Sequence, residues 1–129
     1  MSSAAAAAAR LLPFVALLLA TLSACGSAIP PDRRVVEGDP LRGRQLIAGV
    51  GCGVCHQIPG VDGANGIVGP SLEGVGRRNL LAGVLPNQPD VLTQWVRDAP
   101  SLRPETGMPE MPLSEEEAED VAAYLYTLR

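Results

Sequence analysis

One short segment contains side chains whose types and spacing suit a specific chemistry. Cys52 and Cys55 are separated by two residues, and His56 follows directly. Two thiols at this spacing on a tight turn are placed to add to the two vinyl groups on one edge of a porphyrin, and the next imidazole then reaches the iron. The pattern C-x-x-C-H is typical of c-type haem attachment. We therefore predict one covalent haem c, bonded through Cys52 and Cys55, with His56 as an iron ligand.

Other uses of a C-x-x-C pair suit this chain less well. A structural zinc site needs four ligands, and the sequence has no second cysteine pair and only one histidine. A thioredoxin-like redox pair would need alternating strands and helices around it, and that alternation is absent. Three cysteines are also too few for a disulfide framework.

The residues that could occupy the second axial position on the iron can be narrowed by elimination. Haem iron in proteins is commonly held by His, Met, Cys thiolate or Tyr. His56 is the only histidine, lysine is absent and both motif thiols are used in attachment, so methionine or a vacant position remains. Met1 belongs to the amino-terminal segment, which leaves Met108 and Met111 as candidates. Methionine ligation raises the reduction potential and suits electron transfer.

The amino terminus has the profile of an export signal. Arg10 precedes an apolar run of about a dozen residues, whereas a membrane-spanning helix needs about 20. The run ends in Leu-Ser-Ala-Cys at residues 22–25, which resembles the lipobox of bacterial lipoproteins. We expect a lipoprotein signal peptide at 1–24 and lipidation of Cys25, which would hold the protein on a membrane. A plain secretory signal and an uncleaved anchor are the alternatives.

A linker and one domain follow the signal. Residues 25–38 lack helical periodicity and contain a Pro-Pro pair, so we predict a flexible linker there. The remaining residues, 39–129, are enough for one domain and too few for two hydrophobic cores.

The charge balance argues against several classes of function. All ten basic residues are arginine, and removal of 1–24 changes the formal net charge from −4 to −5. The chain has no basic patch for nucleic acid, so no nucleic-acid partner is expected. It also supplies no acid–base pair in a substrate pocket, so we expect an electron carrier with no small-molecule substrate rather than an enzyme.

Three helices are predicted to surround the motif. Asp39 before Pro40 predicts a helix at about 40–50, in which Gly43 indicates close packing. A middle helix is expected at about 89–98, with an inner stripe of Val91, Leu92, Trp95 and Val96. A capping box of Ser114 and Glu117 starts the last helix. Few aromatic residues follow position 24, so haem must supply much of the buried surface and the apo-protein should fold poorly.

The order of these features resembles class I cytochrome c over residues 38–129. The shared features are the early C-x-x-C-H, a Gly-Pro-x-Leu segment at 69–72, a Met-Pro pair at 108–109 and a Ser-initiated final helix carrying Ala-Ala-Tyr-Leu at 122–125. The resemblance implies an all-α cytochrome c fold, with three to five short helices wrapped around one covalently bound haem.

The resemblance also implies roles for residues outside the motif. It makes Met108, rather than Met111, the second iron ligand, although a second Met-Pro pair at 111–112 departs from the family pattern. The Pro70 carbonyl would accept a hydrogen bond from the haem histidine, and Leu72 would line the haem pocket. Tyr124 would pack over Gly43 where the terminal helices cross.

Two further residues have two interpretations each. Trp95 is either a core aromatic or a haem contact on the methionine side. Arg78, beside Arg77, either pairs with a haem propionate or forms part of a solvated surface pair.

For function, the resemblance implies one-electron transfer at an exposed haem edge. The expected partners are a quinol-oxidising complex and a terminal oxidase, because similar short sequences with Gly-Cys-Gly-x-Cys-His occur as domains attached to oxidase subunits. The expected location is the periplasmic face of the cytoplasmic membrane, with the outer membrane as the alternative. Two rivals stay open: an electron-entry haem subunit of a periplasmic dehydrogenase, and a gas-binding or sensory haem protein with a labile sixth ligand.

Overall fold

The computed structural model describes residues 37–129. The predicted signal peptide at 1–24, the lipidated Cys25 and all but the last two residues of the 25–38 linker lie outside the described residues, so these predictions stay open. Within 37–129, no helix is both long and apolar enough to cross a membrane.

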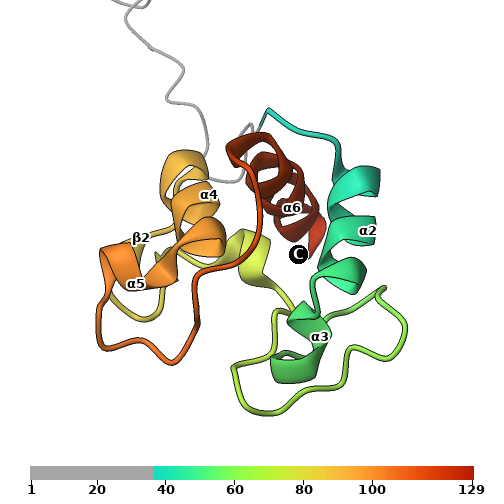
Figure 1. Ribbon diagram of the computed structural model, residues 1–129, viewed down its shortest axis with the longest axis horizontal. Coiled ribbons are helices and arrows are strands. Elements are labelled where there is room, and N and C mark those ends of the chain that lie inside the picture. Colours follow the sequence, from blue (N-terminus) through green and yellow to red (C-terminus); the bar gives the residue numbers. More distant parts are fainter. Residues whose placement is uncertain (1–36) are drawn as a thin grey trace, which may run out of the picture. The chain divides into compact units, whose positions relative to one another are not determined.

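Helices dominate the described part of the chain (Figure 1). In chain order the elements are α2 (Pro40–Gly49), α3 (Cys52–Cys55), the 3-10 turn η2 (Val75–Arg77), β1 (Leu80–Leu81), β2 (Leu85–Pro86), α4 (Pro89–Arg97), α5 (Ala99–Leu102) and α6 (Glu115–Thr127). The two strands form a small antiparallel hairpin in which Leu81 pairs with Leu85. The predicted all-α class is confirmed.

The start of α2 follows from local hydrogen bonding. Asp39 has extended backbone angles, and its side chain accepts hydrogen bonds from the amides of Leu41 and Arg42 at 2.8 and 3.4 Å. Pro40 occupies the first helical position, where its missing N–H costs nothing. The predicted helix is confirmed, although Leu41 is 72% exposed and contributes little to the core.

The start of α6 is the predicted capping box. The Ser114 hydroxyl accepts from the Glu117 amide at 3.2 Å, and the Glu117 carboxylate accepts from the Ser114 amide at 2.9 Å. Three glutamates in the first turn also interact favourably with the positive end of the helix dipole.

The helix α6 lies between α2 and α4 and packs against both (Figure 1). Its buried face is formed by Ala118, Val121, Ala122, Tyr124, Leu125 and Tyr126. Leu92 and Val96 of α4 are also buried, and Val91 and Trp95 pack against the same core. The predicted inner stripe of the middle helix is therefore confirmed.

At the crossing of α2 and α6 the two backbones touch. A Cβ on Gly43 would lie 1.9 Å from the Asp120 carbonyl oxygen, so only glycine fits at this position. The atoms nearest to Gly43 belong to the backbone of Asp120 and Val121, not to the Tyr124 ring. The hydroxyl of Tyr124 donates instead to the Pro59 carbonyl at 2.6 Å. The predicted close packing of Gly43 against the C-terminal helix is confirmed, and its nearest contacts there are with the backbone of Asp120 and Val121.

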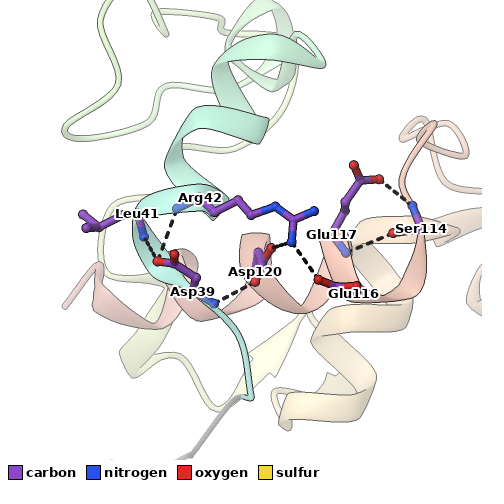
Figure 2. Close-up of polar contacts among 7 residues, drawn as sticks. All are labelled: Asp39, Leu41, Arg42, Ser114, Glu116, Glu117 and Asp120. Atoms are coloured by element: carbon purple, nitrogen blue, oxygen red, sulfur yellow. Dashed lines mark hydrogen bonds and ion pairs between the residues drawn. The ribbon is translucent and has the colours of Figure 1, made fainter.

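A polar cluster ties the same two helices together (Figure 2). The Asp39 amide donates to Asp120 Oδ1 at 2.7 Å, and Arg42 Nη1 lies 2.8 Å from Glu116 Oε1 and 3.1 Å from Asp120 Oδ2. Asp120 is 3% exposed, and its Oδ2 is in ionic contact with Arg42 but has no hydrogen-bond partner in the described chain. These carboxylates, with the hydrogen bond to Glu116 as the largest cause, raise the pKa of the Arg42 guanidinium above its usual value.

Candidate functional site

Both motif cysteines belong to the single helical turn α3. Gly51 precedes the turn with φ +83°, a left-handed conformation that glycine adopts without strain. The amide of His56 closes the turn by donating to the Cys52 carbonyl at 3.0 Å. Cys52 and Cys55 are both half-buried and neither forms a disulfide. The turn therefore presents two free thiols one helical turn apart, as the attachment chemistry requires.

The environment of Cys52 disfavours the charged form of its thiol. Burial raises the pKa of the Cys52 thiol, and the neighbouring Cys55 adds to this effect, while a backbone hydrogen bond opposes it. A raised thiol pKa lowers the fraction of thiolate, the form that acts as the nucleophile in disulfide exchange.

The orientation of His56 is set by one hydrogen bond. Its Nδ1 lies 2.7 Å from the Pro70 carbonyl oxygen. Because a carbonyl oxygen only accepts, Nδ1 must carry the proton, and the lone pair of the neutral ring is then on Nε2. A histidine that binds a metal through one ring nitrogen usually donates a hydrogen bond from the other, often to a backbone carbonyl. The hydrogen bond expected from the resemblance is thus present.

The segment before Pro70 returns along α3 at very close range. The amides of Gly66 and Gly69 donate to the carbonyls of Gly53 and Cys55 at 3.0 and 2.8 Å. A Cβ on Gly69 would lie 2.4 Å from Cε1 of the His56 ring. Any side chain at position 69 would therefore displace the imidazole. Sequence reasoning assigned no role to Gly69, and the only available signal was a glycine directly before the proline.

Leu72 and Arg78 lie on the segment that follows. Leu72 is half-buried against the hydrophobic core, and its amide donates to the Gln57 carbonyl at 2.9 Å, next to His56. Arg78 Nη2 donates to the carbonyls of Ser71 and Glu73 at 2.6 and 2.8 Å. At least part of the Arg78 guanidinium therefore holds this segment in place, and its pairing with a propionate stays a prediction.

The two candidate methionines have different surroundings. Met111 packs against the hydrophobic core, and its amide donates to the Arg97 carbonyl at the end of α4 at 2.8 Å. Met108 is half-buried, is not part of that core, and its amide donates to the Thr106 hydroxyl at 3.2 Å. These surroundings favour a packing role for Met111 and make Met108 the better candidate to bind the iron. The assignment of Met108 stays a prediction.

Trp95 is half-buried and packs against the core from α4. It therefore belongs to the core, as one of its two interpretations stated. A contact with haem on the methionine side is compatible with its remaining exposure and stays a prediction.

The described residues fit a covalently attached haem c, the cofactor that the motif implies. The turn α3 presents two unpaired thiols, His56 has a defined tautomer with Nε2 available to iron, and glycine at position 69 leaves room for the ring.

Comparison with known proteins identifies the family of the chain. Residues 41–129 match the cytochrome c family model. Cytochrome c oxidase subunit 2 of Alkalihalophilus pseudofirmus is 37% identical over 89 residues, which cover 68% of this chain. The chain spans only 25% of the length of that relative. The crystal structure of the c-type cytochrome SorU from Sinorhizobium meliloti has 24% identity and a TM-score of 0.49, covering 69% of this chain and 88% of SorU.

The predicted fold, family and cofactor are thereby confirmed, since the family match covers most of the domain and includes the C-x-x-C-H segment. The chain belongs to the cytochrome c family, whose members bind covalently attached haem c and carry electrons.

Proposed function

We propose that this protein carries single electrons to a terminal oxidase, with haem c bound through Cys52 and Cys55 and with His56 and Met108 as the axial ligands. The observation that carries the proposal is the 2.7 Å hydrogen bond from His56 Nδ1 to the Pro70 carbonyl beside the C-x-x-C turn. When bound, the haem iron supplies a one-electron Fe(II)/Fe(III) couple. The chain itself orients the ligands and limits access of water.

Attachment needs no oxidant under this proposal. Each S–H adds across one vinyl C=C bond, so that an S–C bond forms and the thiol proton goes to the other vinyl carbon. Both cysteines lie on the single turn α3, from which they would hold the haem by two thioether bonds.

The oxidase as electron acceptor is supported by the relative from Alkalihalophilus pseudofirmus. That protein is named cytochrome c oxidase subunit 2, and the region similar to this chain is a quarter of its length. A domain similar to a segment of an oxidase subunit is suited to deliver electrons to an oxidase. We also propose lipid attachment at Cys25 on the periplasmic face, which would keep the carrier close to membrane partners such as a quinol-oxidising complex.

An exposed apolar surface next to the motif is suited to transient docking. Val54, Ile67 and Val68 are 76%, 93% and 82% exposed. They lie on α3 and on the segment that is hydrogen-bonded along it. We call these three residues the apolar patch. Small interfaces suffice for short-lived electron-transfer complexes, and an uncharged interface predicts oxidation rates that change little with salt.

Stopped-flow oxidation of the reduced holoprotein by oxidase-containing membranes tests the proposal. Ile67→Asp should slow oxidation at least tenfold without changing the spectrum. Leu41→Asp is the matched control, since Leu41 is 72% exposed but lies at the end of α2 distant from α3, and it should leave the rate unchanged. No oxidation by such membranes would reject the oxidase as acceptor, and purification with a stoichiometric dehydrogenase subunit would favour the electron-entry role.

Mass spectrometry of the mature protein tests attachment and anchoring together. A mass that includes one haem, a chain starting at Cys25 and acyl groups on Cys25 would support all three parts of the proposal. Unmodified thiols at Cys52 and Cys55 would contradict the haem assignment. A mature chain without acyl groups would contradict only the anchor.

A further inference from the structure

We propose that Asn87 and Tyr126 are positioning residues for the axial histidine, acting through η2 and Arg78 on the segment that carries the Pro70 carbonyl. The inference rests on the proposed role of His56 as an iron ligand. It predicts that a buried hydrogen bond far along the chain from the haem motif changes the electronic properties of the iron.

Asn87 is a polar side chain in an apolar interior, at 1% exposure. Its Nδ2 donates to the carbonyls of Val75 and Arg78, both at 2.9 Å, and its Oδ1 accepts from the Tyr126 hydroxyl at 2.9 Å. Buried polar groups cost free energy unless their hydrogen bonds are made. The side-chain amide of Asn87 therefore links the last turn of α6 to both ends of η2 by hydrogen bonds.

The turn η2 is also pressed against the end of α6 by its backbone. The Gly76 amide donates to the Leu128 carbonyl at 2.9 Å. A Cβ on Gly76 would lie 2.6 Å from the Tyr126 carbonyl oxygen. With the Asn87 bonds on one side and the α6 backbone on the other, η2 has one position relative to the C-terminal helix.

Arg78 transmits that position to the histidine. Its carbonyl is held by Asn87, while its Nη2 donates to the carbonyls of Ser71 and Glu73. Ser71 is the next residue after Pro70 and Glu73 lies three residues after it, and the Pro70 carbonyl itself accepts from His56 Nδ1 at 2.7 Å. A continuous path of hydrogen bonds and short backbone links thus runs from Tyr126 through Asn87 and Arg78 to the ring of His56.

The consequence for the iron follows from ligand chemistry. A strong Nδ1–H to carbonyl bond makes the imidazole a better electron donor, which stabilises the ferric state. If the Pro70–Glu73 segment gains freedom, that bond lengthens on average. The Nδ1 proton should then exchange faster with solvent, and the reduction potential should rise.

The experiment uses the ferric holoprotein and follows the His56 Nδ1 proton by NMR, together with the midpoint potential and thermal unfolding. Tyr126→Phe removes one hydroxyl and little else. Asn87→Leu removes all three side-chain bonds at similar volume. Because one net hydrogen bond contributes about 1 kcal/mol, exchange should become roughly five- to tenfold faster in Tyr126→Phe, with a raised potential. The change should be larger in Asn87→Leu if that variant folds.

Tyr124→Phe is the matched control. It removes a hydroxyl that donates to the Pro59 carbonyl at 2.6 Å from the same helix, so it should cost similar stability. Unlike the Tyr126 bond, that contact does not reach η2 or Arg78. The control should therefore lower the unfolding temperature without changing the potential or the Nδ1 exchange rate.

The outcomes are distinct. If the Tyr126→Phe variant loses stability but keeps the wild-type Nδ1 exchange rate and midpoint potential, the positioning role is overturned. Asn87 is then a structural residue only. Equal changes in Tyr124→Phe and Tyr126→Phe would also overturn it. A wild-type protein in which His56 shows no iron-shifted NMR signal would reject the ligand assignment in the proposed function, which is a separate failure.

Discussion

Gly43 and Asp120 lie in backbone contact, so that a Cβ on Gly43 would be 1.9 Å from the Asp120 carbonyl oxygen. This contact sets how closely α2 and α6 approach each other. The helix α2 leads directly into Gly51 and the α3 turn. The distance between the two terminal helices therefore also sets the position of both motif cysteines relative to the core.

Gly43→Ala should destabilise the protein strongly. The added methyl group meets backbone rather than a flexible side chain, so the helices must separate, and overpacking of this kind costs about 1–3 kcal/mol or more. Gly49→Ala on the same helix is the control, because a Cβ there meets nothing within 4 Å. We expect Gly49→Ala to be neutral or stabilising. Chemical denaturation of the two holoprotein variants measures the difference, and equal stabilities would refute the proposed crossing.

Met108→Ala and Met111→Ala should separate ligation from packing. Met108→Ala should abolish the ferric methionine-to-iron charge-transfer band and open the sixth position. Met111→Ala should keep that band and instead lose about 1–3 kcal/mol of stability, because Met111 packs against the core. Absorption spectroscopy and denaturation of both variants provide the test. The reverse pattern would move the ligand to Met111, and no band in the wild-type protein would favour a gas-binding or sensory role.

Gly69→Ala should disturb the proximal side of the haem. Its Cβ would lie 2.4 Å from His56 Cε1, so the ring must tilt or the Pro70 hydrogen bond must break. We expect a changed reduction potential and a partly high-spin ferric spectrum. Gly107→Ala is the comparison, because a Cβ there meets nothing within 4 Å although the residue is next to Met108. Identical electronic spectra for Gly69→Ala and wild type would show that His56 does not occupy this position in the holoprotein.

Arg42→Met should destabilise the contact between the terminal helices, because it removes the positive charge beside Asp120. It leaves the Asp120 carboxylate, whose side chain is only 5% exposed, without a cation at 3.1 Å. Arg42 itself is 44% exposed, so solvent screens the pair and the expected loss of stability is smaller than for a fully buried pair. Arg44→Met removes an exposed arginine of the same helix and should change stability by less than about 0.5 kcal/mol. Asp120→Asn in the Arg42→Met background should recover part of the loss.

The double variant Cys52→Ser/Cys55→Ser should lack covalent haem and fold poorly. Only Trp95, Tyr124 and Tyr126 provide aromatic side chains to a domain of this size, so much of its apolar contact must come from the cofactor. Far-ultraviolet circular dichroism should show less helix than in the holoprotein, with a broad thermal transition. A cooperative transition at the wild-type temperature would contradict the dependence on haem.

Local chemistry explains what was predictable from the sequence. The haem motif lies within five residues, and the caps at Asp39 and Ser114 need only the next two or three amides. These features depend on side-chain type and on spacing within one helical turn, so the chemistry, the cofactor and the helix starts could be inferred without coordinates. The resemblance to class I cytochrome c added the Pro70 hydrogen bond, which the structure contains.

Only the tertiary structure decided the contacts between distant residues. Asp120 lies 77 positions after Gly43 and Tyr126 lies 39 positions after Asn87, and neither pairing leaves a periodic signal in the sequence. The short α5 helix has a local start signal, since the Asp98 side chain accepts from the Ser101 amide at 3.1 Å, but its four residues are too few to show helical periodicity. The sequence by itself determined the haem chemistry, whereas the approach of α6 to α2 and η2 decided how that chemistry is held, because close packing is a property of several segments together.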